Sequence, residues 1–86
     1  MVKKLVFEAK FKQFYANADE WLKDKIDKQL RFLLDNPKHP SLRLRKKKGT
    51  KYHLADIDYF YRLILKIEKD TCYVIDVGPH DIEKKY

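Results

Sequence analysis

The spacing of apolar residues changes at Asn36-Pro37 in this chain of 86 residues. Before that point, leucine and isoleucine recur every three or four positions between residues 22 and 34, which predicts an amphipathic helix that Asn36-Pro37 ends. After that point, apolar and polar residues alternate, as is typical of strands. A long helix followed by strands limits the chain to an α+β domain in which the helix covers one face of a sheet.

The segment before this helix allows two interpretations. Residues 3–7 predict a first strand, and residues 8–16 fit either a continuation of that strand or a short helix. The sequence Asn17-Ala-Asp-Glu20 matches a capping box, which predicts that the long helix begins there with Asn17 as its N-cap.

Four short runs after Pro37 predict strands, at residues 42–45, 52–57, 59–67 and 71–78. In the last run, Tyr73, Ile75 and Val77 are expected to share one face of the sheet. The expected fold is a single two-layer α+β domain over residues 1–86. It has an N-terminal strand, one or two helices, and then a three- or four-stranded antiparallel sheet.

The positive charge is concentrated in one segment. The chain has 20 Lys and Arg against 13 Asp and Glu, a net charge of +7. Residues 38–51 contain seven basic side chains and no acidic one, so this segment accounts for the whole excess. Such a segment indicates a polyanionic partner, either nucleic acid or an acidic protein, although a charged run also serves simply as a solvated surface.

Composition excludes several other classes. One cysteine cannot form a disulfide framework or a cysteine-based zinc site, and three histidines far apart in the sequence do not predict a metal site. The two glycines cannot build a glycine-rich phosphate loop. No apolar run approaches the length of a membrane span or a signal peptide, so we expect a cytoplasmic protein without membrane partners.

Three residues are candidates for chemistry. Arg62 stands among apolar residues of a predicted strand, where its charge needs an anion. That anion is either an aspartate of the chain (Asp56, Asp58 or Asp76) or the phosphate of a ligand. His80 follows the last strand directly, and histidine as a residue type suits proton transfer, although a lone loop histidine often has no function. Tyr86 is the last residue, where side chains commonly fray.

Three segments together resemble the RelE/ParE toxin superfamily of type II toxin–antitoxin systems. They are LLDNPKHPSLRLRKKKG, YFYRLILKI and CYVIDVGPHDIEKKY, in the family's order and over nearly the whole chain. The spacing from His80 to Tyr86 also resembles that of the ribonuclease branch.

The resemblance implies a metal-independent endoribonuclease of the RelE-like branch, which needs no cofactor and cuts mRNA, typically on the ribosome. It implies that Arg62 stabilises the phosphate and that His80 is a general acid or base. It also implies that Tyr86 either stacks on the nucleotide or takes part in deprotonation near it. The residues expected to hold RNA are Arg43, Arg45, Lys46, Lys47, Lys48, Lys51 and His53. An acidic antitoxin that folds on the toxin is the expected protein partner.

Two positions depart from the ribonuclease branch. Counting back from Arg62, two lysines of that branch fall on His53 and Ala55, and only His53 supplies a basic group. Asp81 also adds a negative charge beside His80. Two alternatives therefore stay open: a ParE-like toxin that poisons gyrase without hydrolysis, and an RNA-binding family member without catalysis.

Overall fold

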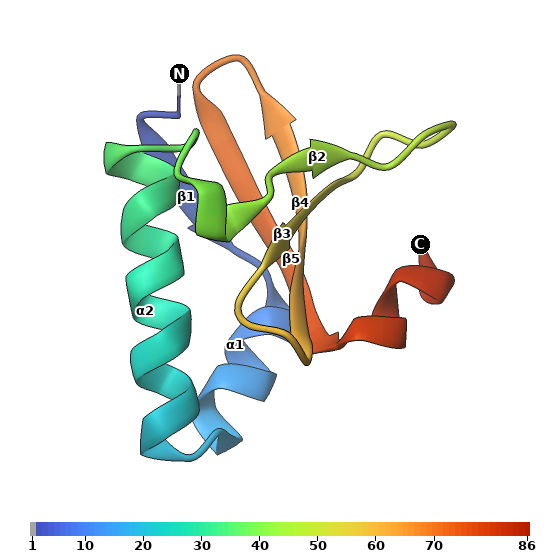
Figure 1. Cartoon of the computed structure of the whole chain (residues 1–86). Coiled ribbons are helices and arrows are strands. Elements are labelled where there is room, and N and C mark those ends of the chain that lie inside the picture. Colours follow the sequence, from blue (N-terminus) through green and yellow to red (C-terminus); the bar gives the residue numbers. More distant parts are fainter. Residues whose placement is uncertain (1) are drawn as a thin grey trace.

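A five-stranded sheet with two helices on one face forms the body of the structure, a computed structural model that describes residues 2–86 (Figure 1). The helices are α1 (Ala9–Asn17) and α2 (Glu20–Asp35), with two short 3-10 helices, η1 (Pro40–Leu42) and η2 (His80–Lys85). The strands are β1 (Lys4–Phe7), β2 (Arg45–Lys46), β3 (His53–Asp56), β4 (Tyr61–Glu68) and β5 (Thr71–Pro79). None of the helices in residues 2–86 has both the length and the apolar character needed to cross a membrane.

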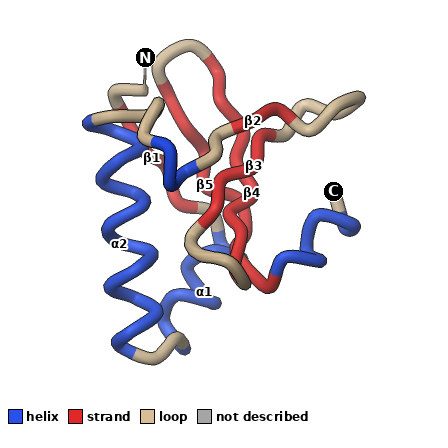
Figure 2. The backbone as a smooth tube through the Cα atoms, viewed as in Figure 1, coloured by secondary structure: helices blue, strands red, loops and turns tan. Residues whose placement is uncertain are grey.

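The strand order is β1-β5-β4-β3-β2. Strands β2 to β5 form the predicted antiparallel sheet, and β1 adds a fifth strand parallel to β5. The parallel pairing needs a long connection, and the helices are part of the chain between β1 and β5 (Figure 2). The predicted α+β class, with an N-terminal strand and one or two helices before the sheet, is confirmed, and the structure has two helices there.

The capping box prediction is wrong, because Asn17 ends the first helix and does not begin the second. Residues 8–16 fall largely within α1, and the side-chain amide of Asn17 donates to the carbonyl oxygen of Gln13 at 2.9 Å. Asp19 precedes α2 as its N-cap, but its side chain makes no capping hydrogen bond. The chain thus turns between two helices at Ala18 and Asp19, which both have extended backbones.

The apolar stripe of α2 forms the core as predicted. Leu22, Ile26, Leu30 and Leu33 are buried in one cluster with the helix-facing residues of β4 and β5. Burial of each such side chain stabilises the fold by about 1.5–3 kcal/mol. The helix face of the sheet therefore carries the larger core, and a smaller buried cluster of Leu54, Ile64 and Ile82 lies on the opposite face.

An irregularity in β5 corrects the predicted faces of that strand. Ile64 pairs with Asp76, but Leu65 pairs with Val74, so Ile75 is an extra residue. Val74 and Val77 both pack in the helix-side cluster as a result, whereas Ile75 packs on the other face. The prediction that Tyr73, Ile75 and Val77 share a face is wrong, because strict alternation does not anticipate an inserted residue.

The predicted strand at residues 42–45 is wrong for residues 42–44. Pro40–Leu42 forms η1, Arg43 has a left-handed backbone (φ 44°), and only Arg45 and Lys46 enter β2. Pro40 begins η1, and the His39 ring accepts a hydrogen bond from the backbone N–H of Ser41, which together favour a turn. The basic segment therefore reaches the sheet as a turn and a two-residue edge strand.

Candidate functional site

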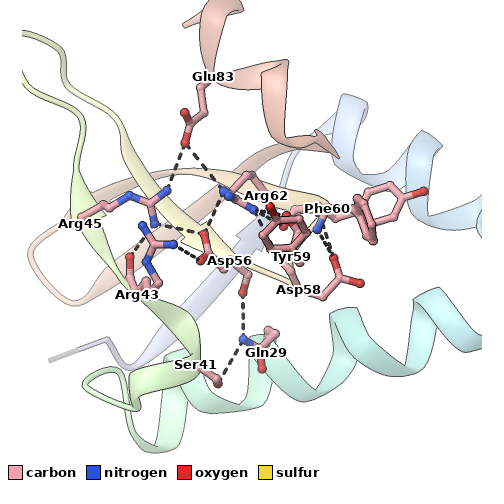
Figure 3. A network of polar contacts seen from close by, with 11 residues as sticks. Gln29, Ser41, Arg43, Arg45, Asp56, Asp58, Tyr59, Phe60, Arg62 and Glu83 are labelled. Atoms are coloured by element: carbon pink, nitrogen blue, oxygen red, sulfur yellow. Dashed lines mark hydrogen bonds and ion pairs between the residues drawn. The ribbon is translucent and has the colours of Figure 1, made fainter.

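A cluster of ion pairs lies around Asp56, whose side chain is only 9% exposed (Figure 3). Arg62 stands directly opposite Asp56 on the neighbouring strand, and its Nε lies 3.0 Å from Oδ1 of Asp56. Arg45 Nη1 lies 3.1 Å from the same oxygen, and Arg43 Nη1 lies 3.3 Å from Oδ2. One buried carboxylate is thus shared by three guanidinium groups, which compensate the cost of burying its charge.

Glu83 of η2 adds a second carboxylate to this group. Its Oε1 lies 3.1 Å from Arg45 Nη2 and 3.8 Å from Arg62 Nε. The Lys47 ammonium donates to the backbone carbonyl of Glu83. We call Arg43, Arg45, Asp56, Arg62 and Glu83 the arginine cluster. Its three guanidinium groups and two carboxylates leave one positive charge.

Arg62 is held from several sides and is 14% exposed. Its Nη1 donates to the backbone carbonyl of Asp58 at 3.1 Å and approaches those of Tyr59 and Tyr61 at 3.3 and 3.4 Å. Its Nε is close to Asp56 without the alignment of a hydrogen bond. The internal ion pair expected as one alternative for Arg62 is present, and the guanidinium is fixed in place by the turn between β3 and β4.

The same turn carries two exposed aromatic rings. Tyr59 is 83% exposed and Phe60 is 62% exposed. The Asp58 carboxylate holds the turn by accepting from the backbone N–H groups of Phe60 and Tyr61. Burial acts to raise the pKa of Asp58, but its hydrogen bonds with Lys25 and with these N–H groups outweigh burial and lower that pKa.

His80 lies at the same end of the sheet as Arg62. Gly78 pairs with Arg62 across β4 and β5, and His80 follows two residues later as the first residue of η2. The imidazole is exposed to solvent. A rigid strand pair thus places His80, an accessible residue of a type that can transfer protons, two positions beyond the residue that pairs with Arg62.

Tyr86 packs back on the sheet through a specific hydrogen bond. Its hydroxyl donates to Oδ2 of Asp76 at 2.6 Å, and its ring contacts Tyr52 edge-on with centroids 5.2 Å apart. Burial, and then the Asp76 carboxylate, raise the pKa of Tyr86 to about 12. The phenol therefore keeps its proton at neutral pH, and the structure gives no support to Tyr86 as a base.

His53 does not share a face with Arg62. Leu54 packs with Ile64 on the face opposite to the helices, whereas Ala55 is fully buried in the helix-side cluster. His53 lies on the side of Ala55 because side chains alternate along a strand. His53 and Ala55 thus lie on the other side of the sheet from Arg62, and the β3 residues on the side of Arg62 are Leu54 and Asp56.

The expected RNA-binding residues are distributed over three places. Arg43 and Arg45 belong to the arginine cluster, and Lys47 contacts the backbone of Glu83. Lys46 pairs with His53 and shares its side of the sheet. Lys48 and Lys51 are exposed in the connection between β2 and β3. The basic side chains of this segment thus do not all lie on one face of the sheet.

Two acidic members of the arginine cluster were not predicted as site residues. Asp56 appeared only among three possible partners of Arg62, and Glu83 had no signal, because it is 38 positions from Arg45. Within residues 2–86, no group of three or more His, Cys, Asp or Glu side chains is arranged to hold a metal ion.

The chain is similar in structure to several toxins. It matches YafQ from Escherichia coli strain BL21(DE3) with a TM-score of 0.75 and 14% identity, over 94% of this chain and 97% of YafQ. The YoeB/ParE toxin from Agrobacterium tumefaciens matches with a TM-score of 0.73 and 20% identity, over 90% and 98%. The archaeal RelE–RelB complex from Pyrococcus horikoshii OT3 matches with a TM-score of 0.75 and 13% identity, over 92% and 96%.

No protein-family model matches the chain, and no curated protein matches it in sequence. At these identities the solved structures establish the fold, which agrees with the resemblance found in the sequence. The chain has the RelE-like fold, over nearly its full length and nearly the full length of the toxins that it matches.

Proposed function

We propose that this chain is the toxin of a type II toxin–antitoxin system and acts as an endoribonuclease that cleaves mRNA on the ribosome and so inhibits translation. One observation carries the proposal: Arg62 is fixed on β4 opposite Gly78, and the exposed His80 follows two residues later. The likeness in fold to YafQ and to the archaeal RelE supports it.

The reaction requires few groups. The 2′-hydroxyl of a ribose attacks the adjacent phosphorus, a cyclic 2′,3′-phosphate forms, and the bond to the 5′-oxygen of the next nucleotide breaks. A base takes the proton of the hydroxyl, an acid protonates the leaving oxygen, and cations stabilise the charge on the phosphate oxygens.

The side chains of the site divide these tasks. Arg62 stabilises the phosphate, and His80 transfers a proton as acid or base. Tyr86 contributes its ring and not a base, because its pKa is raised to about 12. His80 thus accounts for one of the two proton transfers, and no side chain of the site is assigned to the other.

The protein partner in this proposal is an acidic antitoxin that folds on the toxin. Solved neighbours include a DinJ–YafQ toxin–antitoxin complex and a YoeB–YefM complex. Lys48 and Lys51 are exposed outside the arginine cluster and attract acidic segments. A ribosomal target places the proposed activity in the cytoplasm.

Primer extension on cellular mRNA after brief induction tests the proposal. We expect new 5′ ends and arrested translation with the wild type, and neither with His80→Ala or Arg62→Ala. Lys28→Ala, which removes an exposed charge on α2, is the control and should cleave as the wild type does. His80 is exposed, so its substitution leaves the core intact. Equal cleavage by the wild type and His80→Ala would refute the assigned roles.

Two other outcomes would identify the alternatives. Intact mRNA together with accumulating DNA breaks would indicate a gyrase poison of the ParE type. Salt-dependent RNA binding without new 5′ ends would indicate an RNA-binding protein without catalysis.

A further inference from the structure

We propose that the Glu83 carboxylate occupies the place of a phosphate group on Arg45 and Arg62, and that a backbone phosphodiester of RNA displaces it on binding. This inference rests on the proposed RNA substrate and adds an internal competitor to the site. It concerns binding and is independent of which residue transfers the proton.

The geometry around one oxygen supports the displacement. Oε1 of Glu83 lies 3.1 Å from Arg45 Nη2 and 3.8 Å from Arg62 Nε, so two guanidinium groups from β2 and β4 converge on it. Guanidinium groups bind carboxylate and phosphate oxygens with the same donor geometry. A phosphate oxygen at this position would therefore meet both arginines without a change in the sheet.

The two carboxylates of the cluster differ in how firmly they are held. Asp56 is 9% exposed, lies on a strand and contacts all three arginines. Glu83 is 35% exposed and lies on a six-residue 3-10 helix. A partly exposed ion pair contributes little free energy, whereas a buried one is costly to break. Glu83 is therefore the carboxylate that an incoming anion can replace.

The helix η2 has anchors other than this carboxylate. Ile82 is buried with Leu54 and Ile64, and Lys47 donates to the backbone carbonyl of Glu83. The Glu83 side chain can thus swing away while η2 stays in place. Its departure leaves two net positive charges in the cluster where there was one.

The first experiment measures binding of an RNA analogue that cannot be cleaved. The probe is a short fluorescein-labelled 2′-O-methyl oligoribonucleotide, whose Kd is determined by fluorescence anisotropy at fixed salt. Glu83→Gln should lower the Kd about three- to tenfold, because the internal competitor is neutralised. The matched control is Asp81→Asn, which removes one exposed charge from the same 3-10 helix. It should lower the Kd less than about twofold.

Equal effects of Glu83→Gln and Asp81→Asn would overturn the inference, because they would show a general charge effect. No change with Glu83→Gln would overturn it too. Thermal unfolding first establishes that both variants fold. Since the probe lacks a free 2′-hydroxyl, failure of cleavage in the primer-extension experiment would leave this result standing.

A second experiment uses wild-type protein and inorganic phosphate. The Nε–H signals of Arg45 and Arg62 and the carboxyl carbon of Glu83 are followed by NMR during the titration. The three signals should shift with the same dependence on phosphate concentration. Phosphate should also displace the labelled oligonucleotide from the protein. An arginine response without a Glu83 response would overturn the displacement. A response to phosphate without competition of the oligonucleotide would exclude the RNA backbone as the ligand.

Discussion

Asp56 and Arg62 face each other across β3 and β4, with Oδ1 and Nε 3.0 Å apart and side chains that are 9% and 14% exposed. Arg43 and Arg45 reach the same carboxylate from the preceding turn and β2. Gln29 of α2 donates to the backbone carbonyl of Asp56 at 2.8 Å. Asp56 therefore contacts the helix layer through its backbone carbonyl and the arginines of the proposed site through its carboxylate.

Substitution of Asp56 by Asn should destabilise the protein by about 3 kcal/mol, because removal of one partner from a buried ion pair leaves the others uncompensated. Equilibrium urea unfolding measures the change in the free energy of unfolding. The control is Asp24→Asn on the exposed face of α2, which should change that free energy by less than about 0.5 kcal/mol. Similar values for the two variants would contradict a structural role for the Asp56 carboxylate.

The periodic elements were predictable from the sequence. Leucine and isoleucine at helical spacing predicted α2, and alternating residues predicted β4 and β5, since burial of one face sets both periods. The resemblance predicted the RelE-like fold from three short segments.

The cluster was only partly predictable. Asp56 was among the possible partners of Arg62, but contacts such as Arg45–Glu83 join residues 38 positions apart, and no local pattern encodes them. The extra residue Ile75 in β5 interrupts the alternation from which Tyr73, Ile75 and Val77 had been predicted to share one face of the sheet. Asn17 had been predicted to start a helix from its match to a capping box, but its side chain bonds to Gln13 at the end of α1. The residues after His39 had been predicted as a strand from their alternation, but the His39 ring bonds to Ser41 in a turn.

Gly78 permits the close approach of η2, and its replacement by Ala tests this contact. A Cβ at Gly78 would lie 3.0 Å from Cδ1 of Ile82, which is buried. Gly78→Ala should therefore destabilise the protein by about 1 kcal/mol or more. Ile82→Val removes Cδ1, so Gly78→Ala should lower the free energy of unfolding less in the Ile82→Val background than in the wild type. A double-mutant cycle measured by urea unfolding tests this difference. An equal cost in both backgrounds would contradict the proposed clash.

His53 should make stability sensitive to mild acid. Burial, and then the Lys46 charge, lower the pKa of His53 below its ordinary 6.5. The unfolded chain then binds a proton at a higher pH than the folded one. The contribution of the neutral His53 to the free energy of unfolding is therefore present above about pH 6.5. It is lost as the pH falls through the pKa of His53 in the folded protein.

NMR titration of the imidazole signals measures that pKa directly. Lys46→Gln should raise it part of the way toward 6.5, because burial still lowers it, and Lys48→Gln in the exposed turn is the matched control. An unchanged His53 pKa in Lys46→Gln would contradict the assigned contact across β2 and β3. Urea unfolding should show a smaller loss of stability in acid for His53→Gln than for the wild type.

Tyr86 should make stability sensitive to strong base, through its hydrogen bond to Asp76. The folded-state pKa is raised from 10.0 to about 12, so the folded protein keeps the phenol proton where the unfolded chain has lost it. This contribution is fully present below about pH 10 and is lost as the pH rises toward 12. Tyr86→Phe should cost about 1 kcal/mol at neutral pH and remove part of the alkaline decline, measured by urea unfolding on both sides of pH 10. The control is Tyr59→Phe, whose ring is 83% exposed and which should leave the alkaline decline as in the wild type. An unchanged decline in Tyr86→Phe would show that the C-terminal phenol is not held by Asp76 in solution.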